Sequence, residues 1–261
     1  MTPATPTKDR PWALISDLHS NLEALEAVFG DIAEQGAGDV LCLGDVVGYG
    51  PDPEACVDLV MEKCRLTLKG NHDAALIEGE ERFNPYARDA IRWTRRRLKP
   101  GWFKSSRNRV RWDWLRNLPL QHKEGELLFV HGSPRDPLNE YIYPGDILFN
   151  AEGKLAEIFR VVPHALFVGH THHPMVLSSR LGSFTPAEGR DRIALGSDRY
   201  IVNVGSVGQP RDGDPRACYV LFDGEEVRYR RIPYDIDAVA RKIDRIPELD
   251  TVLGQRLHEG L

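Results

Sequence analysis

The stretch Trp12-Ala13-Leu14-Ile15-Ser16-Asp17-Leu18-His19 decides how this chain folds. It begins with a short apolar run and passes directly into the polar pair Asp17 and His19. Short apolar runs are typical of buried strands, and carboxylate and imidazole groups bind metal ions. Open α/β sheets place their ligand sites just beyond the ends of their strands. The stretch therefore predicts a strand over 12–16 that ends at a metal site.

The same arrangement, an apolar run followed by metal-binding residues, recurs four more times. The four later blocks are Gly44-Asp45, Gly70-Asn71-His72-Asp73, His131-Gly132 and Gly169-His170-Thr171-His172. We expect the apolar runs before them to form strands over 40–43, 66–69, 126–130 and 165–168. A single histidine of this kind is more commonly a surface or core residue. Five blocks at strand ends supply seven ligand groups and favour a site for two neighbouring metal ions.

The residue types in these blocks suggest how two ions would be held. Carboxylates are hard anionic donors that can bridge two cations, so Asp45 is the expected bridge. Asp17 and His19 can turn toward one ion, and His170 and His172 can send one ring to each ion. The ligand set suits manganese, iron, zinc and nickel alike. Two such cations lower the pKa of a bridging water toward neutrality, which would give a hydroxide able to attack phosphorus.

Length and composition indicate one large water-soluble domain. The chain has 261 residues, 41% hydrophobic and 28% charged, and a net charge of -5, which argues against a protein that coats nucleic acid. No apolar run approaches the roughly 18 residues that a membrane-spanning helix needs. The start, Met1 to Arg10, has no apolar signal-peptide core, so we expect a cytoplasmic protein. The cysteines form no CxxC pair and are expected to be buried thiols.

The order of patterns predicts an α/β domain over 11–261 after a flexible tail over 1–10. Helical patterns over 21–35 and 52–64 alternate with the first three strands, which indicates a parallel βαβ layout. From about 78 to 118 the pattern becomes helical and reads as an insertion or lid. Strand patterns then return, with a helix expected from about 149 to 161. The strand patterns over 175–231 are expected to form a mostly antiparallel meander, and helices over 235–258 close the chain.

The insertion carries an arginine run, Arg95-Arg96-Arg97, with tryptophans interleaved nearby. Such a run can bind nucleic acid or a nucleotide by charge and stacking. It is more commonly a solvated helix face, and Glu78, Glu80 and Glu81 offset its charge locally. We therefore do not expect nucleic acid as a partner.

In their order, the five blocks resemble the signature of the calcineurin-like metallophosphoesterase superfamily: DxH, GDxx, GNHD, a later H, and GHxH. The resemblance covers residues 12–222 and implies an α/β fold of two face-to-face mixed β-sheets flanked by helices, with the site at the strand ends. It also implies seven metal ligands, which are Asp17, His19 and His172 for one ion, Asn71, His131 and His170 for the other, and Asp45 between them.

The third block adds a residue for chemistry. The resemblance implies that His72 is the catalytic histidine and that Asp73 orients its ring. From the residues alone, a histidine next to the ligand Asn71 can donate a proton to a leaving oxygen or stabilise charge on phosphoryl oxygens. The alternative is a histidine that only makes supporting hydrogen bonds.

One departure from the family pattern bears on the substrate. Serine/threonine protein phosphatases and bacterial dinucleoside tetraphosphatases resemble GDxVDRG in the second block, where the arginine binds phosphate. This chain has Gly48 and Tyr49 in place of that Asp-Arg pair, and Tyr49 is itself a candidate substrate contact. Arg135 and Arg211 are candidate replacements, and surface salt bridges are the alternative for both. Asn21 either faces the metals or caps a helix.

These observations favour a metal-dependent phosphoesterase that acts on a phosphodiester or a nucleotide-like polyphosphate, with a small phosphoester or nucleotide as its partner. A phosphomonoesterase, including a protein phosphatase, is the first alternative, and the missing Asp-Arg pair counts against it. A noncatalytic metal-binding scaffold is the second, and the complete ligand set counts against that. The sequence leaves the substrate, the native metals and the oligomeric state open.

Overall fold

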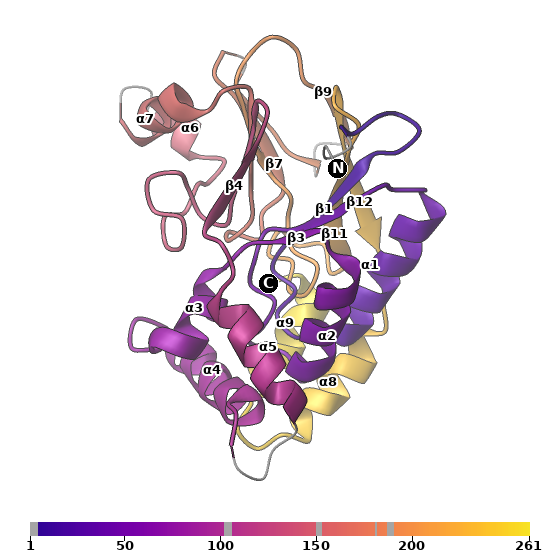
Figure 1. Ribbon diagram of the computed structural model, residues 1–261, viewed down its shortest axis with the longest axis vertical. Helices are drawn as coiled ribbons and strands as arrows, with labels where there is room; N and C mark the ends of the chain where they lie inside the picture. The colour runs from indigo at the N-terminus through magenta and orange to yellow at the C-terminus, as the bar shows by residue number, and fades with distance from the viewer. Residues whose placement is uncertain (1–4, 102–105, 150–152, 181, 187–190) are drawn as a thin grey trace.

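The computed structural model describes residues 5–101, 106–149, 153–180, 182–186 and 191–261, and contains two six-stranded mixed sheets (Figure 1). The first sheet contains, in spatial order, β3 (Leu66–Thr67), β2 (Val40–Cys42), β1 (Trp12–Ile15), β11 (Ala217–Phe222), β12 (Glu226–Ile232) and β9 (Arg192–Ala194). The second contains β4 (Gln121–Glu124), β5 (Leu127–Val130), β6 (Ala165–Val168), β10 (Tyr200–Asn203), β7 (Met175–Ser178) and β8 (Gly182–Phe184). The expected pair of mixed sheets is confirmed.

The three N-terminal strands are parallel, as the alternating patterns predict. β1 pairs with β2, and β2 pairs with β3. The connecting helices are α1 (Leu22–Glu34) and α2 (Pro53–Lys63). Asn21 caps α1, because its side-chain oxygen accepts the Ala24 backbone N–H at 3.1 Å. Parallel strands end at one edge of their sheet, so the first three blocks arrive at the same place.

The core is layered because β1 is buried on both faces. Trp12 and Leu14 lie in the cluster between the two sheets, together with Phe129 and Phe167 of the second sheet. Alternate residues of β1 lie in a cluster that includes buried residues of α1 and α2. A third cluster joins the outer face of the second sheet to α7 (Lys154–Val161). Figure 1 shows α7 and α6 (Asp146–Phe149) beside the second sheet, and α1 and α2 beside the first.

The region 78–118 is helical, as expected. Its main helices are α4 (Pro85–Leu98) and α5 (Ser106–Arg116), which follow α3 (Asn71–Glu78), and residues 102–105 lie outside the described part. The C-terminal helices α8 (Ile236–Asp244) and α9 (Val252–Glu259) share a buried apolar cluster with α4. In Figure 1 these helices lie together below the sheets. The insertion is therefore anchored to the end of the chain.

Two expectations differ from the structure. The single meander does not form: β7, β8 and β10 belong to the second sheet, whereas β9, β11 and β12 belong to the first. The chain crosses between the sheets because β10 pairs in parallel with β6. Strand periodicity indicates which residues are extended, but not which partner each strand takes. The helix expected to begin near Phe149 is divided into α6 and α7, with residues 150–152 outside the described part.

Three smaller expectations concern the tail, the thiols and the membrane. Residues 1–4 of the expected flexible tail lie outside the described residues. Just after them, Thr7 and Arg10 form an isolated antiparallel β-bridge. All four cysteines are free, and Cys42, Cys56 and Cys218 are buried. Among the residues that the structure describes, no helix has the length and apolar character needed to cross a membrane.

Candidate metal centre

Backbone strain is concentrated in the sequence blocks. Outside glycine, seven described residues have a positive φ, and all lie in or beside the blocks: Asp17, His19, Ser20, Asp45, Tyr49, His170 and His172. The left-handed region is uncommon for side-chain-bearing residues and persists only where the surroundings impose it. Here it turns the chain sharply at the strand ends, which directs several buried side chains toward one point.

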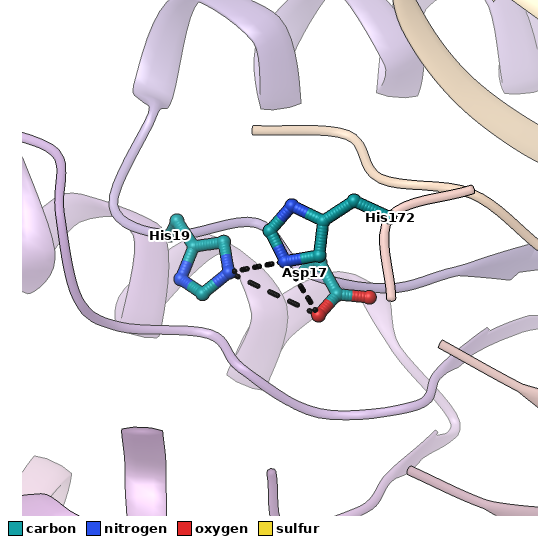
Figure 2. A group of neighbouring side chains, drawn as sticks. All are labelled: Asp17, His19 and His172. Atoms are coloured by element: carbon teal, nitrogen blue, oxygen red, sulfur yellow. Dashed lines mark hydrogen bonds and ion pairs between the residues drawn. The ribbon is translucent and has the colours of Figure 1, made fainter. Parts of the chain in front are cut away.

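The first ligand group consists of Asp17, His19 and His172. Their ligand atoms all lie within 4.8 Å of one another. The Nε2 atoms of the two rings are 3.1 Å apart, and the His172 Nε2 lies 3.3 Å from Oδ1 of Asp17. In Figure 2 the Nε2 atoms of both rings and the carboxylate of Asp17 face a common centre. The group combines the first and last blocks of the sequence.

The hydrogen bonds on the far side of these rings decide which nitrogen carries the proton. The Nδ1 of His19 faces the carbonyl of Val47 at 3.3 Å, and the Nδ1 of His172 faces the carbonyl of Gln209 at 2.5 Å. A carbonyl oxygen only accepts, so both Nδ1 atoms are protonated and both Nε2 atoms carry lone pairs. Two lone pairs that face each other across 3.1 Å repel, unless a cation lies between them and the carboxylate.

The second ligand group consists of Asn71, His131 and His170. The His131 Nε2 lies 3.0 Å from Oδ1 of Asn71, and its Nδ1 donates to the carbonyl of Leu43 at 3.0 Å. Ligand atoms of His131, His170 and Asp45 lie within 4.8 Å of one another. Burial alone would lower the pKa of His131, but Asp45 outweighs it and raises the pKa to about 9. This part of the site therefore favours positive charge.

Asp45 lies between the two groups. Its Oδ1 accepts the backbone N–H of His72 at 2.8 Å, which fixes the carboxylate plane. Its Oδ2 lies 3.7 Å from Nε2 of His19 and 3.4 Å from Nε2 of His131. One oxygen therefore faces a histidine of each group, as a bridging carboxylate must.

Unsatisfied buried atoms give a second reason to expect metal ions at these side chains. Three buried atoms of the blocks have no hydrogen-bond partner, namely Oδ1 of Asp17, Nδ1 of His72 and Nε2 of His170. A buried polar atom left unsatisfied costs about 1–3 kcal/mol. Cations bound by the two groups would satisfy the first and the third of these atoms. The seven expected ligands thus lie together, and His131, which is protonated at pH 7 without a metal, would release its Nε2 proton on binding one.

Burial sets the protonation of the other rings. It lowers the pKa of His19 and His172, that of His72 to about 4, and that of His170 to about 3. These rings are therefore neutral at pH 7, and neutral imidazole is the form that binds metals. Burial acts against charge on Asp45 as well, but the neighbouring histidines outweigh it and hold its pKa well below the usual range.

His72 lies at the edge of the cluster. Its ring packs against Tyr49, with 4.6 Å between ring centroids, and against Phe83, with 4.9 Å. One nitrogen also lies within 4.8 Å of ligand atoms of His19 and Asp45. The geometry therefore admits two roles for His72, either as a metal ligand or as a group that acts on a bound substrate.

The expected contact between Asp73 and the His72 ring does not form. Both oxygens of Asp73 accept backbone N–H groups instead, from Gly70 at 3.0 Å, from Val47 at 3.2 Å and from Val46 at 3.4 Å. As the third residue of α3, Asp73 points back toward the start of its own helix and cannot follow the neighbouring ring. Its carboxylate ties the second block to the third.

Gly48 is required by the position of His72. Its φ is +109°, and a Cβ at this position would lie 2.4 Å from Nδ1 of His72. We expect Gly48→Ala to lower the free energy of unfolding by about 1–3 kcal/mol, the typical cost of a strained backbone conformation. Urea unfolding measures this. The control is Gly30→Ala in α1, where a Cβ meets nothing within 4 Å and should stabilise the protein by about 0.5–1 kcal/mol. Equal effects of the two substitutions would contradict the prediction.

The structure separates the four candidate substrate residues. Arg211 lines the same pocket as the ligands, and its guanidinium donates to Oε1 of Gln209 at 2.8 Å and to the Tyr49 hydroxyl at 3.3 Å. Arg135 instead pairs with Glu157 at 2.6 Å and does not line the pocket. Asn21 caps α1, and its amide donates to the Gly208 carbonyl at 2.9 Å, so its side chain is used structurally.

The pocket extends well beyond the ligands. It has a volume of about 780 Å³ and is lined by Arg82, Phe83, Tyr141 and Arg256 in addition to the block residues. Tyr141 stacks on His170, with 4.0 Å between ring centroids. No sequence pattern marks Arg82 and Arg256, because nothing distinguishes them from the chain's other arginines. Tyr141, in the exposed loop after His131, carried only a weak signal.

The chain is similar to known proteins over nearly its whole length. The family description "Calcineurin-like phosphoesterase" matches residues 11–241. An uncharacterized protein of Methanocaldococcus jannaschii is 39% identical over 95% of this chain and 97% of its own length. The crystal structure of a metallophosphoesterase from Sphaerobacter thermophilus is 36% identical, with a TM-score of 0.80, and covers 97% of this chain and 99% of its own.

A crystal structure of a hypothetical protein from Pyrococcus horikoshii shares the fold, with a TM-score of 0.73 at 18% identity over 96% of this chain and 98% of its own. The family match agrees with the five sequence blocks, and the solved structures agree with the two sheets. The chain therefore belongs to the calcineurin-like phosphoesterase family.

Proposed function

We propose that this chain hydrolyses a phosphodiester or a nucleotide-like polyphosphate with two metal ions, which the ligand set allows to be manganese, iron, zinc or nickel. The observation that carries the proposal is the position of Asp45 Oδ2, 3.7 Å from His19 and 3.4 Å from His131. When bound, two such cations supply a nucleophile from water near neutral pH and offset negative charge on the phosphoryl oxygens. Asp17, His172, Asn71 and His170 complete the two ligand groups.

His72 is the residue that we assign to the leaving group. Its ring lines the pocket beside the ligands and is neutral at pH 7 because burial lowers its pKa to about 4. A neutral imidazole still carries one N–H, which can donate a hydrogen bond to the leaving oxygen as charge develops there. Tyr49 and Phe83 hold the ring from two sides and limit the approach of water.

Arg211 is the residue that we assign to the phosphoryl oxygens. Its guanidinium is fixed in the pocket by Gln209 and the Tyr49 hydroxyl, and no carboxylate among the described residues lies within 4.0 Å of it. A guanidinium matches phosphate oxygens in geometry and charge. Tyr49 occupies the position of the arginine in the GDxVDRG pattern of the phosphatases. In this chain its hydroxyl instead helps to position Arg211, an arginine from a later loop.

The size of the pocket favours a substrate larger than a phosphomonoester. A volume of about 780 Å³ lies in the range of pockets that enclose a whole small molecule, roughly 300–1,000 Å³. A phosphomonoesterase or protein phosphatase remains the alternative from the same chemistry. A noncatalytic scaffold is the alternative from another class.

A substrate panel tests the proposal. We expect the manganese-loaded protein to hydrolyse bis-p-nitrophenyl phosphate or dinucleoside polyphosphates with a higher kcat/KM than p-nitrophenyl phosphate. Activity on p-nitrophenyl phosphate alone would establish the monoesterase instead. If folded, metal-loaded protein hydrolysed no phosphoester in the panel, the scaffold would be the better account.

A further inference from the structure

Besides Arg211, two arginines in the pocket have no acidic partner. Arg82 lies just before α4, and Arg256 lies on α9, yet both line the pocket that contains the metal ligands. Within the described ranges, neither guanidinium has a carboxylate within 4.0 Å, and that of Arg256 lies over the ring of Tyr86, 6.0 Å from its centroid. Both guanidinium groups are therefore available to a ligand.

This availability is not a general property of the arginine-rich insertion. On α4, Arg92 and Arg95 both pair with Glu80, at 2.7 and 2.6 Å, and Arg96 pairs with Glu248 at 3.0 Å. These neighbouring charges are neutralised within the protein. Arg88 and Arg109 of the insertion also have no carboxylate within 4.0 Å among the described residues, but neither lines the pocket, whereas Arg82 and Arg256 do.

Contacts of Phe83 and Tyr86 show that the two arginines lie on the far side of His72 from the metal ligands. The Phe83 ring touches the His72 ring, with 4.9 Å between centroids, and Arg82 directly precedes Phe83. Arg256 reaches the same region, because its guanidinium lies over Tyr86 in the first turn of α4. The buried cluster shared by α4, α8 and α9 holds these segments together, as their proximity in Figure 1 illustrates. Arg82 and Arg256 thus lie on the side of the leaving group that we assign to His72.

We infer that Arg82 and Arg256 bind a phosphate group carried by the leaving group, so that the substrate is a polyphosphate cleaved at a phosphoanhydride bond. This inference rests on the proposed function. In the reaction, water adds its oxygen to phosphorus and loses one proton to the solvent, the bond from phosphorus to the bridging oxygen breaks, and that oxygen keeps the electron pair. The departing phosphate then carries an additional negative charge, which the two guanidinium groups stabilise.

The charges at this end of the pocket agree with an anionic ligand. Glu259 on α9 also lines the pocket, so one carboxylate opposes two guanidinium groups. A leaving group that carries no phosphate, such as a nitrophenolate or a nucleoside hydroxyl, would leave both arginines without a partner. The inference therefore selects the polyphosphate from the two substrate classes proposed above.

Binding measured by isothermal titration tests the inference without relying on turnover. The probes are methylenediphosphonate, which mimics a phosphoanhydride that cannot be cleaved, and methylphosphonate, which has a single anionic group. We expect manganese-loaded wild-type protein to bind the diphosphonate at least tenfold more tightly, because a charge-assisted hydrogen bond contributes roughly a factor of ten or more. The double variant Arg82→Ala/Arg256→Ala should lose most of this preference and keep its affinity for methylphosphonate.

The matched control is Arg241→Ala on α8, an exposed arginine outside the pocket whose nearest acid is Asp235 at 4.0 Å. The single variant Arg82→Ala provides a second test should the double variant unfold, because Arg82 is exposed and its side chain has no hydrogen-bond or ion-pair partner among the described residues. An unchanged diphosphonate preference in the double variant or in Arg82→Ala would overturn the inference, even if the wild type hydrolyses phosphoesters. The control Arg241→Ala should keep the wild-type preference. Conversely, an arginine-dependent preference in a protein that hydrolyses nothing would retain the anion site and reject the proposed function.

Discussion

Asp45→Asn is expected to reduce the metal content of the protein at both sites and to lower kcat/KM by at least about a hundredfold. Changes around a metal site typically cost 10–100-fold in affinity or activity, and Asp45 faces a histidine of each ligand group. A neutral amide bridges two cations poorly. The amide oxygen can still accept the His72 backbone N–H, so we expect the fold to persist. Elemental analysis after gel filtration measures the metal content.

Asp113→Asn is the matched control, because Asp113 is an exposed residue of α5 whose nearest cation is Arg116 at 3.6 Å. It should leave metal content and activity unchanged. If Asp45→Asn kept the full wild-type metal content, Asp45 would not be a bridge. Loss of one ion only would assign Asp45 to a single group.

His72→Ala is expected to lower kcat by about 10²–10³, the typical cost of removing a positioned hydrogen-bond donor to developing negative charge, and to leave the metal content unchanged. The loss should be smaller for a substrate that releases p-nitrophenolate, because that anion needs less stabilisation. Comparing kcat for p-nitrophenyl and alkyl diesters measures this difference. A supporting hydrogen bond alone would slow both diesters equally.

The structure makes this a sharp test, since a ring nitrogen of His72 lies within 4.8 Å of ligand atoms of His19 and Asp45. Loss of one metal in His72→Ala would make His72 a ligand and remove it from its proposed role. His122→Ala on β4 is the control, because this half-buried histidine faces Glu124 at 3.3 Å, remote from the pocket, and should change neither quantity.

The strands that carry the ligands were predictable because burial leaves a clear pattern. Residues 12–15 are apolar on both faces of their strand, and Asp17 follows where the strand ends. The same logic located the strands before Asp45, His131 and His170. It could not locate sheet partners, because β9 and β10 are adjacent in sequence but belong to different sheets. Pairing between strands distant in sequence is decided by packing, which local periodicity does not record.

Side-chain contacts in the site were less predictable than the ligand blocks. Asp73 was expected beside the His72 ring, but the start of α3 directs its carboxylate to backbone N–H groups. Arg135 and Arg211 looked equivalent in the sequence. Only the fold shows that Arg135 pairs with Glu157, whereas Arg211 reaches the pocket. Such choices depend on neighbours from distant segments.

The outer pocket could not be predicted at all. Arg82 and Arg256 are 174 positions apart by residue number, and only the packing of α4 against the C-terminal helices brings them to one pocket. Nothing in the composition of either segment marks these residues. The arginines of the outer pocket are therefore brought together only by tertiary structure, whereas the candidate metal ligands can be recognised from local sequence motifs.

Anomalous diffraction from crystals of the protein grown with manganese tests the central claim most directly. The account predicts two peaks about 3.5–4 Å apart, the spacing typical of paired catalytic metals, on either side of Asp45 Oδ2. One peak should lie beside Asp17, His19 and His172, and the other beside Asn71, His131 and His170. A single peak, or two peaks that do not share Asp45, would contradict it.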